Sequence, residues 1–219
     1  MKLISIILIS LALLLAGCLT NQPAETGPCA GLSDSAKDEC YFEELSCSKI
    51  KNDKVRDSCV AEMAKVKDDV VVCDLIVDSA TKDFCTQTFA VKEGDYEVCM
   101  DIKTPYWQNN CFNSIATDTN DDTLCAFIVN DKQRIGCYTT IAFETANIDL
   151  CVFTEDHDFC VFTIAKQTKD FKLCEEIENT LNQNACRLKV AKERNDQSLC
   201  KEIKIADLVQ ICNEYFDSA

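Results

Sequence analysis

Residues 99–137 read CMDIKTPYWQNNCFNSIATDTNDDTLCAFIVNDKQRIGC, and successive cysteines in this stretch are 12, 14 and 12 residues apart. The same alternation of 12 and 14 runs from Cys47 to Cys212, with a single gap of 9 between Cys151 and Cys160. The two gaps together make a period of 26 residues. A constant period of this length is typical of a repeat protein in which each repeat is one supersecondary unit.

The first cysteine of each repeat is surrounded by the features of a short helix. Asp or Asn stands four residues before it, and these side chains accept hydrogen bonds from the free amides of a helix N-terminus. Apolar residues stand one residue before and three residues after the cysteine in most repeats, with Thr154 an exception. Since these positions share one helical face, we expect a short helix that buries its cysteine. The expected caps are Asp69, Asp95, Asp121, Asn147, Asp170 and Asp196.

The second cysteine of each repeat lies in a pattern typical of a longer helix. An apolar residue usually follows four positions later, and in six repeats an alanine follows five positions later, which allows a neighbouring helix to approach closely. Thr104 and Pro105 fit an N-cap followed by proline at the first helical position. No repeat alternates polar and apolar residues as strands do, and 5 Gly and 3 Pro are too few for a hairpin-rich β fold.

Two cysteine pairings fit the spacing, one within each unit and one between consecutive units. Pairing within units uses all sixteen cysteines after Cys18, whereas the offset pairing leaves Cys29 and Cys212 alone. The offset pairing also joins Cys40 to Cys47 across CYFEELSC, which reads as continuous helix and would rise about 10 Å, too far for a disulfide. We therefore favour the pairs Cys29–Cys40, Cys47–Cys59, Cys73–Cys85, Cys99–Cys111, Cys125–Cys137, Cys151–Cys160, Cys174–Cys186 and Cys200–Cys212.

The expected fold class is all-α, a right-handed solenoid of about eight disulfide-stapled helical hairpins over residues 29–219. Each hairpin has helices of about 8–14 residues, at or below the length that is stable alone in water. A disulfide that closes a loop of about 13 residues contributes on the order of 3 kcal/mol in the chain-entropy account. The architecture resembles that of TPR and Sel1-like α-hairpin solenoids, whose sequence signatures are absent here, so the resemblance is one of architecture only.

The N-terminal segment has the layout of an export signal, with Lys2 before an apolar run over residues 3–15. The run is too short to cross about 30 Å of hydrocarbon as a helix. It closes in Leu15-Ala16-Gly17-Cys18, which resembles the lipobox of prokaryotic lipoproteins. This resemblance, confined to the N-terminal segment, implies that residues 1–17 are a signal peptide and that Cys18 is lipidated. An ordinary cleaved signal followed by an unpaired cysteine is the alternative.

An exported, tethered protein is the setting that these features predict. Residues 19–28 are polar, with two prolines and a glycine, and we expect the lipidated Cys18 and a flexible tether to occupy residues 18–28. Cysteines persist as disulfides outside the cytoplasm, so the predicted location is extracytoplasmic, lipid-anchored to the cell membrane or an outer membrane. The formal net charge of −15 repels phosphates and excludes nucleic acid as a partner. The expected partners are the membrane, through the lipid, and another envelope or surface protein.

Motifs for chemistry are scarce. His157 stands among Glu155, Asp156 and Asp158, where a metal site is conceivable but a solvated turn is favoured. The stretch 118–122 opens like an EF-hand loop but lacks the later glycine and glutamate, and it is better explained as the loop that carries a helix cap. No zinc-ribbon, haem, nucleotide or serine-hydrolase motif is present. We expect no catalytic residue, metal or cofactor.

The remaining candidate is an aromatic pair, Tyr106 and Trp107, in a loop or first helical turn. It could anchor a partner, since aromatic residues are enriched at binding hot spots. The alternative is ordinary packing of Trp107 under its hairpin. We expect a binding or scaffolding module, and a thiol-based metal-binding protein and an envelope enzyme are the alternatives.

Overall fold

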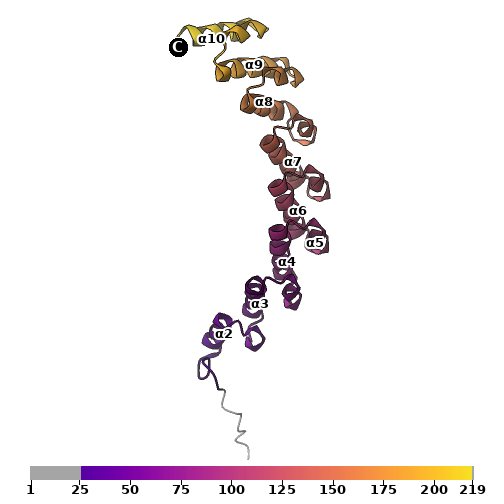
Figure 1. Cartoon of the computed structure of the whole chain (residues 1–219), viewed down its shortest axis with the longest axis vertical. Helices are drawn as coiled ribbons and strands as arrows, with labels where there is room; N and C mark the ends of the chain where they lie inside the picture. Colours follow the sequence, from indigo (N-terminus) through magenta and orange to yellow (C-terminus); the bar gives the residue numbers. More distant parts are fainter. Residues whose placement is uncertain (1–25, 219) are drawn as a thin grey trace, which may run out of the picture.

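The computed structural model describes residues 26–218. The predicted signal peptide, Cys18 and most of the predicted tether lie outside the described residues. Within 26–218 the chain forms alternating short and long helices and no strand. The helices stack in chain order into one curved array, with its first and last helices at opposite ends (Figure 1). The prediction of an all-α solenoid built from repeated, disulfide-linked helix pairs is confirmed.

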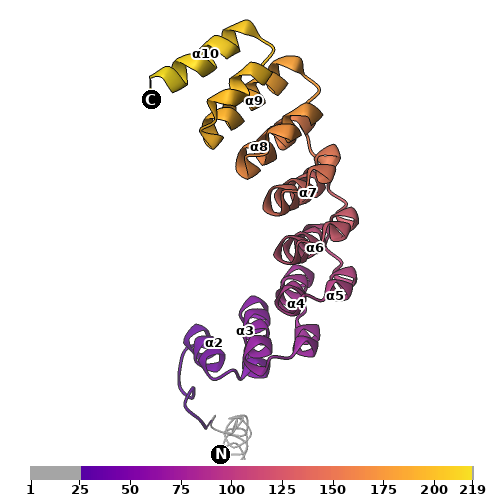
Figure 2. The ribbon, with the colours of Figure 1, turned by 45° about the horizontal axis from the view of Figure 1, so that its top comes forward.

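The long helices each carry the second cysteine of a unit and lie on the inner side of the curve, while the short helix α5 lies on its outer side (Figure 2). The long helices are α2 (Asp34–Glu43), α3 (Asp53–Lys67), α4 (Ser79–Glu93), α6 (Pro105–Thr119), α7 (Asp131–Thr145), α8 (His157–Thr168), α9 (Thr180–Arg194) and α10 (Ala206–Asp217). The short helices are η1 (Cys47–Lys49), η2 (Val70–Leu75), α5 (Tyr96–Asp101), η3 (Asp122–Phe127), η4 (Ile148–Phe153), η5 (Phe171–Glu176) and η6 (Gln197–Glu202).

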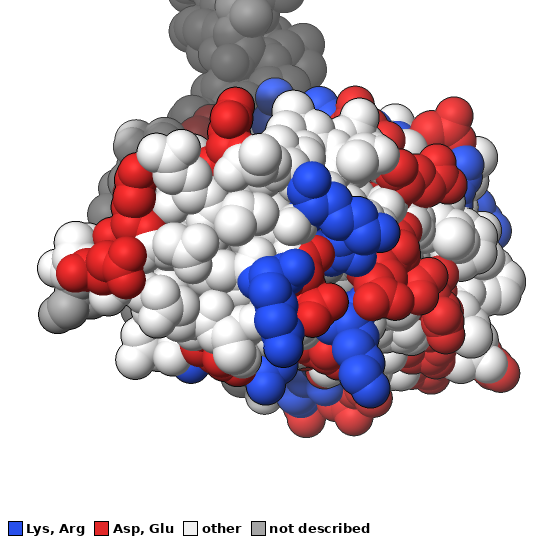
Figure 3. All heavy atoms as spheres, turned by 90° about the horizontal axis from the view of Figure 1, so that it is seen from above, with Lys and Arg blue, Asp and Glu red and all other residues white. Residues whose placement is uncertain are grey.

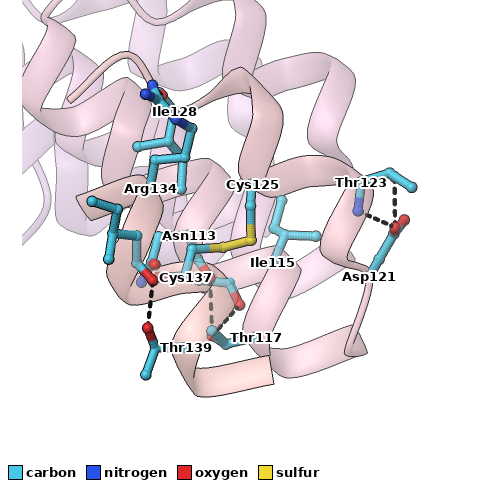
Figure 4. Close-up of a disulfide and its surroundings, with 12 residues drawn as sticks. Asn113, Ile115, Thr117, Asp121, Thr123, Cys125, Ile128, Arg134, Cys137 and Thr139 are labelled. Carbon is cyan, nitrogen blue, oxygen red and sulfur yellow. Dashed lines mark hydrogen bonds between the residues drawn. A yellow bond between two sulfur atoms is a disulfide. The ribbon is translucent and has the colours of Figure 1, made fainter. Parts of the chain in front are cut away.

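A short helix follows each long helix from α3 to α9 after one residue with a left-handed backbone, as at Asn120, where φ is 56°. The next residue, Asp121, caps η3 because its side chain accepts a hydrogen bond from the Thr123 amide at 3.1 Å (Figure 4). The Asp121 amide itself donates to the carbonyl of Ala116, which closes the end of α6. All six predicted caps accept a backbone amide in this way.

The short helices are tighter and shorter than expected. Apart from α5, which is α-helical, they are 3₁₀ helices of three to six residues, below the predicted range. A 3₁₀ helix has three residues per turn, so residues i and i+3 lie in line. This places Cys125 and Ile128 on one side, joined by the Ile128 amide and the Cys125 carbonyl at 3.1 Å. The pattern of cysteine and isoleucine therefore comes from 3₁₀ geometry.

Seven disulfides join the two helices of a unit, and the eighth joins Cys29, in a turn before α2, to Cys40 of α2, so the first unit lacks the predicted short helix. The Cα–Cα distances are 5.5–5.8 Å. The pairing is the within-unit pairing that parity favoured. Cys125 of η3 faces Cys137 of α7, and both are fully buried (Figure 4). Ile128 and Ile141, also buried, extend this core along the array.

The predicted continuous helix over residues 40–47 is wrong. Residues 40–47 are not one helix, because α2 ends at Glu43 and Leu45 has a left-handed φ of 51°. The Ser46 amide donates to the Tyr41 carbonyl at 2.8 Å and closes the helix before η1 begins at Cys47. The chain therefore reverses between these two cysteines, and each joins a partner in its own unit.

Removing one bridge tests how far the units depend on it. We expect the double substitution of Cys125 and Cys137 by Ala to lower the free energy of unfolding by about 3 kcal/mol, the value for a loop of this length. Urea unfolding followed by circular dichroism measures the change. The same substitutions at Cys200 and Cys212 are the control at the array end, where hydrogen exchange should show unfolding limited to one side. An unchanged unfolding midpoint for the central pair would contradict the role assigned to the bridge.

Candidate functional site

A recurring contact between units, here called the inter-unit clamp, comes from the residue two positions before the second cysteine. In α4 this residue is Asp83, whose carboxylate accepts the amides of Lys103 and Thr104 at 3.3 and 2.7 Å. These amides lie just before the next long helix, α6. Asp83 is 5% exposed, and two backbone donors compensate its buried charge. Each clamp therefore fixes where the next long helix starts.

The clamp is present at six of the seven junctions between described units. The acceptors are Asp38, Asp57, Asp83, Asn109, Asp158 and Asn184, and their partners lie 13–14 residues later at the first junction and 20–21 residues later at the others. None of these six acceptors is among the site residues predicted from the sequence. The available signal was Asp or Asn at a constant position before the second cysteine in six units.

A second contact between units involves the residue directly before the second cysteine and the residue four positions before it in the next unit. Between α4 and α6 these are Phe84 and Trp107, with ring centroids 5.0 Å apart. Between α6 and α7, Gln133 donates its Nε2 to Asn110 Oδ1 at 2.9 Å. Each of these contacts joins one long helix to the next, and its first residue directly follows the clamp acceptor in the chain.

The two residues of the predicted aromatic pair differ in their surroundings: Trp107 packs within the junction and Tyr106 is exposed. Trp107 is half-buried, packs against Phe84 and touches the central core cluster. Tyr106 stands beside it with ring centroids 4.8 Å apart and is 59% exposed. Both lie in the first turn of α6, and a role for Tyr106 in binding stays a prediction.

The junction between α7 and α8 departs from the others at every one of these positions. Ile135 stands where the clamp acceptor is expected, and Gly136 stands where Phe84 or Asn110 stands in other units. Helix α8 has 12 residues, and its N-cap Asp156 lies only four residues before Cys160, whereas the N-cap of α7 lies seven before Cys137. The gap of 9 thus removes the first turn of α8.

A groove of about 980 Å³ occupies the place of that missing turn, here called the α7–α8 groove. Its α7 wall includes Ile135, Gly136 and Thr140, and its opposite wall includes Glu155 and Phe159. A Cβ atom added at Gly136 would meet nothing within 4 Å, so the groove is open above this residue. The equivalent groove between α2 and α3 measures about 740 Å³ and keeps Asp38 and Val55 in its lining.

His157 is the first residue of α8 and does not lie in a free turn as favoured from the sequence. Its Nδ1 is 3.6 Å from Asp158 Oδ1, too far for a hydrogen bond, and has no other partner among the described residues. Burial alone would raise the pKa of Asp158, but hydrogen bonds from the Asn179 and Glu178 amides outweigh it and lower that pKa. Asp158 is therefore held charged by the clamp.

Residues 26–218 contain no group of three or more His, Cys, Asp and Glu side chains arranged to hold a metal ion. No helix in this described part of the chain is long and apolar enough to cross a membrane. On the C-terminal end of the array, Lys and Arg side chains lie beside Asp and Glu (Figure 3). One example is the contact of Lys189 with Glu193 at 2.9 Å on α9.

Comparisons with known proteins give no relative. A scan against protein-family models finds no match. A search of curated proteins finds none, and a search of solved structures finds none. The site is therefore assigned from its own geometry.

The clamp predicts a measurable loss of stability on its removal. In Asp83→Ala the amides of Lys103 and Thr104 lose their acceptor, and we expect the free energy of unfolding to fall by about 1–3 kcal/mol. Asp101→Ala, an exposed acid on the neighbouring α5, is the control and should change stability by at most about 0.5 kcal/mol. Equal effects of the two substitutions in urea unfolding would contradict the clamp.

The clamp also predicts a pH dependence. Because folding lowers the pKa of Asp158 from its ordinary value of 3.8, the stability that this group supplies is complete above that value. It is lost as pH falls below 3.8 through the lower folded pKa. Asp158→Asn should flatten this part of the stability curve, measured by thermal unfolding at a series of pH values, and a curve parallel to that of the unchanged protein would argue against the assignment.

Proposed function

We propose that the chain is a membrane-anchored extracytoplasmic lipoprotein whose helical array is a protein-binding or scaffolding module. The observation that carries the proposal is the contrast between a constant frame and a variable surface. Caps, cysteines and clamps repeat along the described units. The segments between paired cysteines change from unit to unit, for example KNDKVRD at 51–57 and VDSATKD at 77–83.

The frame suits binding because it holds that variable surface in a fixed shape. A partner that contacts several units then meets side chains already in position, which lowers the entropy lost on binding. The eight disulfides are compatible with an extracytoplasmic location. The net charge of −15 favours partners with a complementary basic surface.

The competing thiol-based function is less well supported. It needs reduced cysteines that lie close enough to share a soft metal ion. All sixteen cysteines from Cys29 to Cys212 are paired in disulfides. Each unit contains one bridge, and successive bridges lie in successive units along the array.

Lipidation is the part of the proposal that is tested most directly. When the full chain is expressed in a prokaryotic host and extracted from membranes, the mature protein should begin at Cys18 with a mass increased by a lipid. Cys18→Ser should appear in the soluble fraction. Intact mass spectrometry measures both outcomes, and an unmodified Cys18 in the mature protein would contradict the anchor.

Binding is tested with the array itself. The soluble chain starting after Cys18, immobilised through its N-terminus, should retain a surface or envelope protein that rebinds after purification. The same chain reduced and alkylated is the control, because its units have lost their bridges. Retention that is equal on both supports, or absent from both, would count against a binding module.

A further inference from the structure

We propose that the α7–α8 groove is the docking site of this module, and that it accepts a partner segment in which an aromatic or large aliphatic side chain stands next to Lys or Arg. This inference rests on the proposed binding function and specifies its site and partner chemistry. Three differences from the other junctions coincide here. Ile135 replaces the clamp acceptor, Gly136 replaces a larger residue, and α8 lacks its first turn.

The size of the guest follows from the equivalent junction between α4 and α6. There Trp107 lies against Phe84 with ring centroids 5.0 Å apart, so two large side chains occupy this part of the junction. In the α7–α8 groove, Gly136 replaces Phe84 and Asp156 replaces Trp107 at the corresponding positions. The space of two large side chains is thus open, and one inserted aromatic ring from another molecule fits it.

The walls of the groove favour an apolar guest. Ile135 and Phe143 from α7 and Phe159 from α8 line it, and Phe159 is 62% exposed. A large side chain inserted between them would remove this apolar surface from water, which favours binding. An aromatic anchor in such a recess is typical of a binding hot spot.

The charges around the groove favour a basic neighbour of that guest. Asp131, Glu155 and Asp156 contribute carboxylates to the lining and Lys132 one ammonium group. Asp131 is already paired with Arg134, whereas Glu155 forms no ion pair among the described residues. A Lys or Arg beside the anchor can therefore reach Glu155. A second copy of this chain is disfavoured as the guest, since both copies carry a charge of −15.

The test uses the complete oxidised array and three labelled peptides of one helical host sequence, with central pairs Trp-Lys, Ala-Lys and Trp-Glu. Fluorescence anisotropy should show the tightest binding for Trp-Lys, with about tenfold weaker binding when Trp is replaced by Ala. Replacing Lys by Glu should also weaken binding, and that difference should shrink as salt rises. Equal affinities for the three peptides would overturn the proposal.

Variants of the array locate the binding. Gly136→Phe fills the groove and should weaken Trp-Lys binding about tenfold, whereas Gly136→Ala leaves the groove open and should change it less than about twofold. Glu155→Lys should weaken binding, and Glu178→Lys, an exposed residue at the same distance from the first cysteine of the next unit, should not. The Glu155 pair keeps the test valid if Gly136→Phe does not fold, which circular dichroism would reveal.

The outcomes separate this inference from the proposed function. If an envelope protein is retained equally by the unchanged array and by Gly136→Phe, the array binds through another surface, so the groove assignment is wrong and the binding function stands. If light scattering shows that the array dimerises and that Gly136→Phe abolishes the dimer, the groove belongs to a self-contact and the proposed partner is wrong.

Discussion

The array depends on the disulfide that joins a short 3₁₀ helix to the long helix that follows it. A helix of six residues has too few internal hydrogen bonds to persist in water. The disulfide holds η3 against α7 at a Cα–Cα distance of 5.8 Å, and Ile128, three residues after Cys125, is buried beside it. Without this bond a unit has neither the length nor the core to keep its shape. With it, the two helices of a unit are fixed against each other and can pack on the next unit.

Units are joined by weaker and more varied contacts. A buried carboxylate or amide accepts the amides that precede the next long helix, and side chains above it complete the junction. Such a contact fixes position and orientation, because a carboxylate must meet two N–H groups at once. The α7–α8 junction lacks it, and apolar packing of Val161, Ile164 and Ile141 holds the units there. The junctions of this regular array therefore differ, and the α7–α8 junction is held by apolar packing without a clamp.

The caps and bridges could be predicted because they depend on short-range patterns. Asp121 caps the helix that begins one residue later, and Cys125 joins a cysteine 12 residues away. The clamp could not be predicted with equal ease, since Asp83 on a helix resembles any solvated acid and its partner amides lie 20 and 21 residues later. The groove could not be predicted from the sequence. Gly136 indicates open space only by comparison with Phe84, whose contact with Trp107 is known from the structure. Tyr106 lies in the first turn of α6, one of the two places that the sequence left open, and its surroundings depend on the fold.

Every bridge in residues 26–218 closes a loop inside its own unit, and none crosses a junction. Gene duplication or loss of one whole period can therefore lengthen or shorten the protein without leaving any cysteine unmatched. Each bridge can form as soon as the second cysteine of its own unit is available, with no need for distant sequence. The covalent frame is in this sense modular, and the number of units can change without altering the bridges of those that remain.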